Sequence, residues 1–310
     1  MIEYLLKNWI TAAICTIAIL ALWWYPPVQC DGNLFDSAKY RLITIVLACV
    51  NGLALTVLSL RYLPFGRANR IVPFCYLFFI FSFPQARAFS AAFPAALFVV
   101  LGLYALFKSG ETKSSTAPFF TSSFLVGCAC LFYTTSWVAV VCFAVMAIAL
   151  NLLYGRNILV FLGGFLLPIG CFLLYRHLFV ADVFDFIKAL FDGSERFRLQ
   201  PVPRIPATLF LVLVYIYLFF RLLMRWLSRS FGNKSYRYRV LASIVWMMVV
   251  CGIPAIFLSD KVVGYLPVMA IPASLLMSYY FSEERITKRM KVEFTVLLLA
   301  VMLNQVAFFL

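Results

Sequence analysis

The chain has 310 residues, of which 65% are apolar and 12% are charged, whereas soluble domains have about 45–50% apolar and about 25% charged residues. A soluble domain of this length needs more charged residues than this on its hydrated surface. A disordered chain is excluded as well, because disorder requires a low apolar content. With 33 phenylalanines and 16 tyrosines the composition is typical of a protein solvated by lipid, so we expect its net charge of +14 to face anionic headgroups and not nucleic acid.

Eleven apolar runs are candidates for transmembrane helices, since a helix needs roughly 17–25 apolar residues to cross a bilayer. In chain order the runs are 10–25, 42–60, 71–85, 88–107, 119–135, 137–154, 158–175, 207–224, 240–258, 262–281 and 293–310. We therefore predict an all-α polytopic membrane protein with about eleven transmembrane helices, in which residues 1–310 form a single domain. The runs 71–85 and 119–135 are short, and whether they cross the whole bilayer is left open.

The first run ends in bulky aromatic residues, Trp23, Trp24 and Tyr25, where a cleaved signal peptide has small residues. Glu3 also lies where a signal peptide has a basic head. We predict an uncleaved first helix whose aromatic residues lie at the membrane interface.

The lysine and arginine residues predict the orientation, because cytoplasmic loops carry an excess of them. With a cytoplasmic N-terminus and an external C-terminus, inner segments hold 17 of the 26 basic residues and outer segments hold 9. Without a crossing at 71–85, the inner count would be 11 and the outer count 15, so the charges favour that crossing. The inner face then carries +12 and the outer face +2. We predict a multi-pass membrane protein with a cytoplasmic N-terminus and an external C-terminus.

The longest predicted loop, 176–206, lies on the outer side and begins with Arg176 and His177. Apolar residues at helical spacing between 178 and 191 predict a short amphipathic helix in the headgroup layer. Three arginines follow on a proline-rich segment: Arg196, Arg198 and Arg204. These arginines can bind a phosphate or pyrophosphate group bidentately, or they can simply contact lipid headgroups. His177 is the single histidine, and it is either a titrating group near neutral pH or an interfacial side chain with satisfied hydrogen bonds.

Two carboxylates in the first outer loop, Asp31 and Asp36, are candidate catalytic residues. They can act as a general base or hold a divalent cation. The alternative is a solvated turn, in which Asp31 precedes a glycine and Asp36 caps the next helix. Arg87 is the single charge of the third outer turn, where it either snorkels to the interface or projects into a cavity.

Cysteine and histidine content excludes several kinds of site. Eight of the nine cysteines fall inside apolar runs, where they pack as small apolar side chains, and Cys30 lies alone in an outer loop. One histidine excludes metal sites made from several imidazoles, so we predict no such metal site and no cofactor, apart from a divalent cation at the two aspartates if the protein is an enzyme. The chain also lacks a glycine-rich phosphate loop and a Gly-x-Ser-x-Gly elbow.

The apolar runs contain few polar side chains. No run holds an acidic residue at its centre, which argues against a proton-coupled pump. Asn51, Asn304 and Gln305 are the main polar groups at depth, and we expect them to form hydrogen bonds between helices. In the inner loops, 225–239 combines basic and aromatic residues and 282–292 mixes charges. Beside a membrane span such segments bind anionic lipid and fix the topology, so no nucleic-acid partner is expected.

The stretch 97–179 carries a resemblance to a known family. Its features are LFVVLGLYALFK at 97–108, ACLFY at 129–133, Trp137, LYGRN at 153–157 and LLY at 173–175. In these residues the chain resembles a family of uncharacterised bacterial polytopic inner-membrane proteins, some of whose members are labelled beta-carotene monooxygenase. The resemblance extends over most of the chain and supplies no catalytic residues. The label does not suit the chain, because carotenoid oxygenases bind iron with four histidines and this chain has only His177.

Three functions remain open from the sequence. The first is a non-catalytic subunit or scaffold of an envelope complex with a protein partner in the membrane, since the small-residue faces Ala91/Ala95 and Ala92/Ala96 permit close helix packing. The second is a polyprenyl-phosphate-dependent glycosyl or related transferase at the outer face, with Asp31 or Asp36 as the base. Its phosphate ligands would be Arg87, Arg196, Arg198 and Arg204. The third is a transporter or flippase of a lipid or another amphiphile, which needs a polar path through the helices.

Overall fold

The computed structural model describes residues 9–23, 38–63, 71–87, 90–112, 116–133, 136–179, 206–230, 236–257, 262–281 and 287–309. Over these ranges the chain forms eleven α-helices and one short 3-10 helix, with no strand. The prediction of an all-helical protein is therefore confirmed for the described part of the chain.

The helices follow the apolar runs closely. They are α2 (Trp9–Trp23), α3 (Ala38–Tyr62), α4 (Val72–Phe81), η3 (Pro84–Arg87), α5 (Ala92–Thr112), α6 (Thr116–Phe132), α7 (Trp137–Ala149), α8 (Arg156–Phe179), α10 (Pro206–Ser230), α11 (Tyr236–Phe257), α12 (Val262–Phe281) and α13 (Lys288–Phe309). The run 71–85 is divided into α4 and η3, because Pro84 has no N–H to continue the first helix.

Five helical segments are long and apolar enough to cross a membrane. They are Arg41–Tyr62, Ala92–Thr112, Arg156–Phe179, Pro206–Leu227 and Lys288–Ala307. Shorter apolar helices include Val72–Phe81 and Thr116–Phe132, which correspond to the two runs that were short in the sequence. Exposed leucine, isoleucine and valine side chains cover the outside of the long helices, as expected for surfaces that contact lipid.

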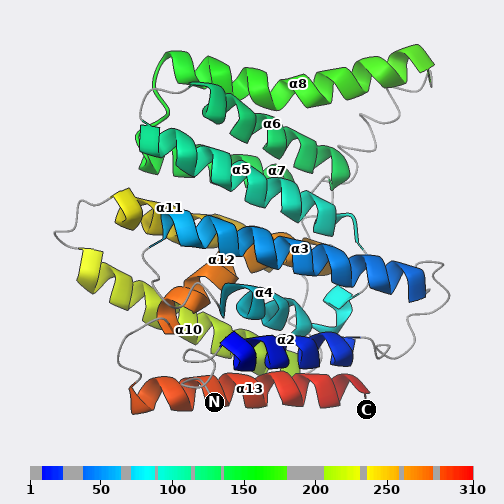
Figure 1. Cartoon of the computed structure of the whole chain (residues 1–310), viewed down its shortest axis with the longest axis vertical. Coiled ribbons are helices and arrows are strands. Elements are labelled where there is room, and N and C mark those ends of the chain that lie inside the picture. Colours follow the sequence, from blue (N-terminus) through cyan, green and yellow to red (C-terminus); the bar gives the residue numbers. More distant parts are fainter. Residues whose placement is uncertain are drawn as a thin grey trace.

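The helices lie side by side, with α8 at one edge of the molecule and α13 at the other (Figure 1). At the first edge α8 packs on α6, and α6 packs on α5. In the middle α4 contacts α2, α3 and α12, and every residue of α4 except Pro73 is buried. A ten-residue helix thus forms the centre of one part of the bundle, and the longer helices surround it.

Polar contacts show which helix ends lie together. Arg61 in the last turn of α3 contacts Glu111 in the last turn of α5, and Tyr236 at the start of α11 donates to the carbonyl oxygen of Phe107 in α5. Glu293 in the second turn of α13 accepts a hydrogen bond from Tyr280 at the end of α12. One end of the bundle therefore holds the last turns of α3, α5, α10 and α12 and the first turns of α11 and α13 (Figure 1). We call it the basic end, because the segments 221–239 and 282–293 at or beside these helix ends hold ten basic and three acidic residues.

The three polar residues expected to join helices do so. Asn304 of α13 donates to the carbonyl oxygen of Ser82 at 2.9 Å, and Gln305 donates to that of Phe81 at 2.7 Å. Asn51 of α3 donates to the carbonyl oxygen of Phe93 in α5 at 3.0 Å. The prediction of interhelical hydrogen bonds is confirmed, and two of them satisfy carbonyl groups that the end of α4 leaves without partners inside the helix.

Glycine permits close contact between α6 and α8. A Cβ atom on Gly164 of α8 would lie 2.1 Å from Ser123 Oγ and 2.8 Å from the carbonyl oxygen of Phe120. A Cβ atom on Gly127 of α6 would lie 2.6 Å from the carbonyl oxygen of Phe165. Backbone atoms cannot move away as a side chain can, so these two glycines set the distance between the helices.

We expect Gly164→Ala to lower the stability of the protein by about 1–3 kcal/mol, because the added methyl group overlaps a backbone carbonyl. Thermal unfolding of the purified protein in detergent measures this effect. Gly163→Ala is the matched control, since a Cβ atom there meets nothing within 4 Å. Its stability should be unchanged or slightly raised, and equal losses in the two variants would contradict the interpretation.

Candidate functional site

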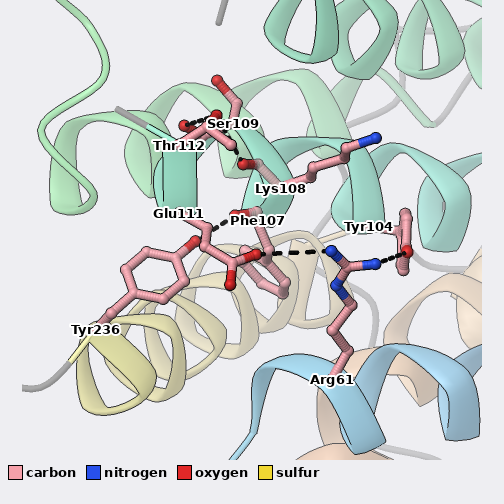
Figure 2. Close-up of polar contacts among 8 residues, drawn as sticks. All are labelled: Arg61, Tyr104, Phe107, Lys108, Ser109, Glu111, Thr112 and Tyr236. Carbon is pink, nitrogen blue, oxygen red and sulfur yellow. Dashed lines mark hydrogen bonds and ion pairs between the residues drawn. The ribbon is translucent and has the colours of Figure 1, made fainter. Parts of the chain in front are cut away.

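The first polar cluster at the basic end joins α3, α5 and α11 (Figure 2). Arg61 Nη1 donates to Tyr104 Oη at 2.8 Å, and Nη2 lies 3.9 Å from Glu111 Oε2. The guanidinium carbon also lies 5.5 Å from the ring centroid of Tyr62. Because the Arg61 and Glu111 side chains are 50% and 52% exposed, water screens their ion pair. This cluster holds three helix ends together and does not adjoin a described cavity.

The second polar cluster is formed by Tyr217, Arg221, Arg225, Tyr280 and Glu293, and we call it the Glu293 cluster. The carboxylate accepts hydrogen bonds from the hydroxyl groups of Tyr217, at 3.2 Å, and Tyr280. Arg221 Nε lies 3.4 Å from Glu293 Oε1, and the Arg225 guanidinium carbon lies 5.0 Å from the ring centroid of Tyr280. The Glu293 side chain is only 10% exposed, so these contacts are less screened than those of Glu111.

Helix geometry explains the assembly of the Glu293 cluster. Tyr217, Arg221 and Arg225 are four residues apart, so they lie along one face of α10. That face meets the first turns of α13, where Glu293 is the single acidic residue of the helix. Tyr280 reaches the same carboxylate from the last turn of α12. One carboxylate therefore connects three helices that are separated in sequence.

A small cavity of about 40 Å³, partly open to the surroundings, adjoins this cluster. Its lining comes from α4, α10, α11 and α12, and it is formed by Phe79, Tyr215, Leu218, Phe219, Leu222, Met248, Ala273, Leu276, Met277, Tyr280 and Phe281. Tyr280 belongs to both the cavity wall and the Glu293 cluster. The lining is otherwise almost entirely apolar, and Tyr215 directs its hydroxyl group to Ser82 Oγ at 2.9 Å. The arrangement places a small apolar cavity beside charged side chains at the basic end.

The predicted outer-face residues fall mostly outside the described residues. This applies to Asp31, Asp36, Arg196, Arg198 and Arg204 and to the amphipathic helix expected between 178 and 191, apart from its first two residues. The outer site therefore stays a prediction. The divalent cation considered for the two aspartates stays a prediction as well.

Arg87, Arg176 and His177 do lie in described segments. Arg87 is the last residue of η3, where only its backbone is described. Arg176 and His177 lie in the last turn of α8, because the helix continues to Phe179 and does not end at residue 175 as expected. Basic residues suit that position, since they oppose the negative end of the helix dipole. The helix thus extends into the segment 176–206, which was predicted to be a loop.

Eight of the cysteines lie in described residues, and all eight have free thiols. Cys142 Sγ of α7 lies 3.5 Å from Cys251 Sγ of α11, and both are buried. Over the described ranges no group of three histidine, cysteine or acidic side chains could hold a metal ion. The two thiols pack together between helices, in agreement with the expected role of cysteine as a small apolar residue.

Sequence reasoning missed the Glu293 cluster. It did not single out Glu293, and it assigned the segment 225–239, which contains Arg225, to contact with anionic lipid. The four-residue spacing of Tyr217, Arg221 and Arg225 was a usable signal of a common helix face. Nothing in the sequence indicated that this face would meet the start of α13.

Comparison with known proteins identifies the family. Residues 8–310 match the model of a family of unknown function (DUF6427). The chain therefore belongs to this family, which agrees with the resemblance to an uncharacterised family seen in the sequence. The chain has no significant match among the curated proteins or the solved structures.

We expect Glu293→Gln to lower the stability by about 1–3 kcal/mol, because it removes a largely buried charged acceptor from two tyrosines and an arginine. Glu111→Gln is the matched control, since its carboxylate is half exposed and its ion pair is screened. Chemical unfolding of both variants in mixed micelles measures the difference. If Glu111→Gln lowered the stability as much as Glu293→Gln does, burial of the carboxylate would not explain its contribution to stability.

Proposed function

We propose that the chain is a multi-pass protein of the bacterial inner membrane that crosses the bilayer eleven times. In this proposal the N-terminus and the basic end are cytoplasmic, the C-terminus is external, and the protein is a non-catalytic subunit or scaffold of an envelope complex. The observation that carries the topology is the common direction of α3, α5, α10 and α12, all of which end at the basic end.

The distribution of charge supports the orientation. Residues 221–239 contain six basic residues and no acidic one, and residues 282–293 contain four basic and three acidic residues. Both segments lie at or beside helix ends that meet at the basic end. Positive charge at this end suits the cytoplasmic leaflet, because that leaflet is anionic and because cytoplasmic loops retain lysine and arginine.

The scaffold role is favoured over transport by the composition of the described interior. The buried polar side chains there are serine, threonine, asparagine and glutamine, surrounded by a large cluster of apolar side chains. Several of them donate to backbone carbonyl groups, as Ser82, Asn304 and Gln305 do. A polar path of the kind that a flippase needs is not formed by these described helices. The transferase function depends on Asp31 and Asp36 and therefore stays an alternative.

Reporter fusions test the topology. Green fluorescent protein inserted between Gly232 and Asn233, in the link between α10 and α11, should fluoresce, because it folds into its fluorescent form in the cytoplasm. Alkaline phosphatase fused after Leu310 should be active, because it matures outside the inner membrane. An active phosphatase at the first position, or fluorescence at the second, would reverse the proposed orientation.

Affinity purification and mutagenesis separate the scaffold from the transferase. In a mild detergent the full chain should co-purify reproducibly with a membrane protein, and recovery of the chain alone would count against the scaffold. The double variant Asp31→Asn/Asp36→Asn should leave both the co-purification and the surface glycan profile unchanged. A changed glycan profile would favour the transferase, because it would assign chemistry to these two carboxylates.

A further inference from the structure

Two cysteines that are far apart in the sequence meet inside the bundle. Cys142 Sγ of α7 lies 3.5 Å from Cys251 Sγ of α11, both thiols are free, and both residues are 0% exposed. A disulfide bond brings two sulfur atoms to about 2.05 Å, so each sulfur has to move by only about 0.7 Å to form one. A rotation about the Cα–Cβ bonds can supply a movement of this size.

Three helices hold the two sulfur atoms in place. α7 packs directly on α11. Cys142 Sγ also lies 3.9 Å from the carbonyl oxygen of Met247, one turn before Cys251. Tyr265 of α12 donates its hydroxyl group to Cys251 Sγ at 3.2 Å. Because these contacts fix both side chains, the two thiols are already positioned to react with each other.

The pair is surrounded by apolar structure and not by water. Cys142 lies five residues after the start of α7, and Cys251 lies six residues before the end of α11. Each is therefore roughly 8–9 Å along its helix from the nearer end. Val141, the residue before Cys142, is exposed on the outside of α7, so an apolar molecule in a bilayer has only a short distance to travel to the pair. A charged oxidant is disfavoured there, because burial of an unpaired charge is costly.

We propose that Cys142 and Cys251 are a redox pair, whose oxidation by a lipid-soluble quinone joins α7 to α11 through a disulfide. Both S–H bonds break and one S–S bond forms. The two electrons and the two protons pass to the carbonyl oxygens of the quinone, which leaves as a hydroquinone, so no charge remains in the apolar interior. The proposal uses the membrane location given under the proposed function, but neither the orientation nor the scaffold role.

Peptide mapping of the full chain in lipid nanodiscs tests the proposal. The protein is reduced with tributylphosphine, freed of it, and treated with decylubiquinone or with oxidised glutathione at the same concentration, and the remaining thiols are then alkylated. We expect decylubiquinone to link the peptides of Cys142 and Cys251 roughly 10-fold faster than glutathione, because glutathione is charged and stays in water. Absence of the linked peptide with decylubiquinone, or equal rates with the two oxidants, would overturn the proposal.

Thermal unfolding measures the consequence for the bundle. The two cysteines are 109 residues apart in the sequence, so a link between them strongly restricts the unfolded chain. We expect the linked protein to unfold about 5 °C above the reduced protein, and tributylphosphine should reverse the shift. An unchanged unfolding temperature in fully linked protein would contradict a lock between α7 and α11.

Variants locate the effect within the protein. Cys142→Ala and Cys251→Ala each remove one thiol and should abolish both the linked peptide and the thermal shift. Cys75→Ala is the matched control, since Cys75 is also a buried thiol but lies on α4, and this variant should keep both responses. A thermal shift that survives in Cys142→Ala, or is lost in Cys75→Ala, would contradict the assignment of the pair.

The peptide mapping of the unmodified protein needs no variant, so it decides the proposal even if a cysteine variant fails to fold. A reporter-fusion result that reversed the orientation of the chain would leave the link intact, because a lipid-soluble quinone reaches the bilayer interior from either side.

Discussion

In an apolar bundle every backbone carbonyl group that a helix leaves unpaired needs another donor, and the buried end of α4 depends on this constraint. The carbonyl groups of Phe81 and Ser82 are buried because α4 lies among longer helices. Asn304 and Gln305 of α13 supply the missing donors. Leaving one such group without a partner costs about 1–3 kcal/mol in proteins, so these amides fix the position of α13 against α4.

The same contacts connect the end of α4 to α10. Thr208 donates to Asn304 Oδ1 at 2.7 Å, and Ser82 Oγ shares a hydrogen bond with Tyr215. Tyr215 also packs its ring 5.0 Å from that of Phe79. Because α10 contributes part of the cavity wall and both arginines, the amides of α13 help to fix the position of the cavity by holding α10 in place. The Glu293 cluster then joins α10, α12 and α13 again at the basic end.

The two polar clusters at the basic end have different surroundings, although both pair arginine with glutamate and tyrosine. The cluster of Arg61 and Glu111 is half exposed and connects helix ends (Figure 2). The Glu293 cluster has a largely buried carboxylate and an apolar cavity beside it. Exposed ion pairs contribute little to stability, whereas the contacts of a largely buried carboxylate are screened less by water. This difference is why the second cluster is the better candidate for a functional site.

The amino-acid sequence alone determined the all-helical class and the approximate position of each helix, because hydropathy is a local property of twenty or so neighbouring residues. It also predicted that Asn51, Asn304 and Gln305 would join helices, since amides at depth need partners. Only the tertiary structure decided which carbonyl groups those amides meet, that the run 71–85 is two helices, and that Glu293 lies beside Arg221. These facts depend on contacts between residues far apart in the chain, and local composition carries no information about which helix will lie beside which.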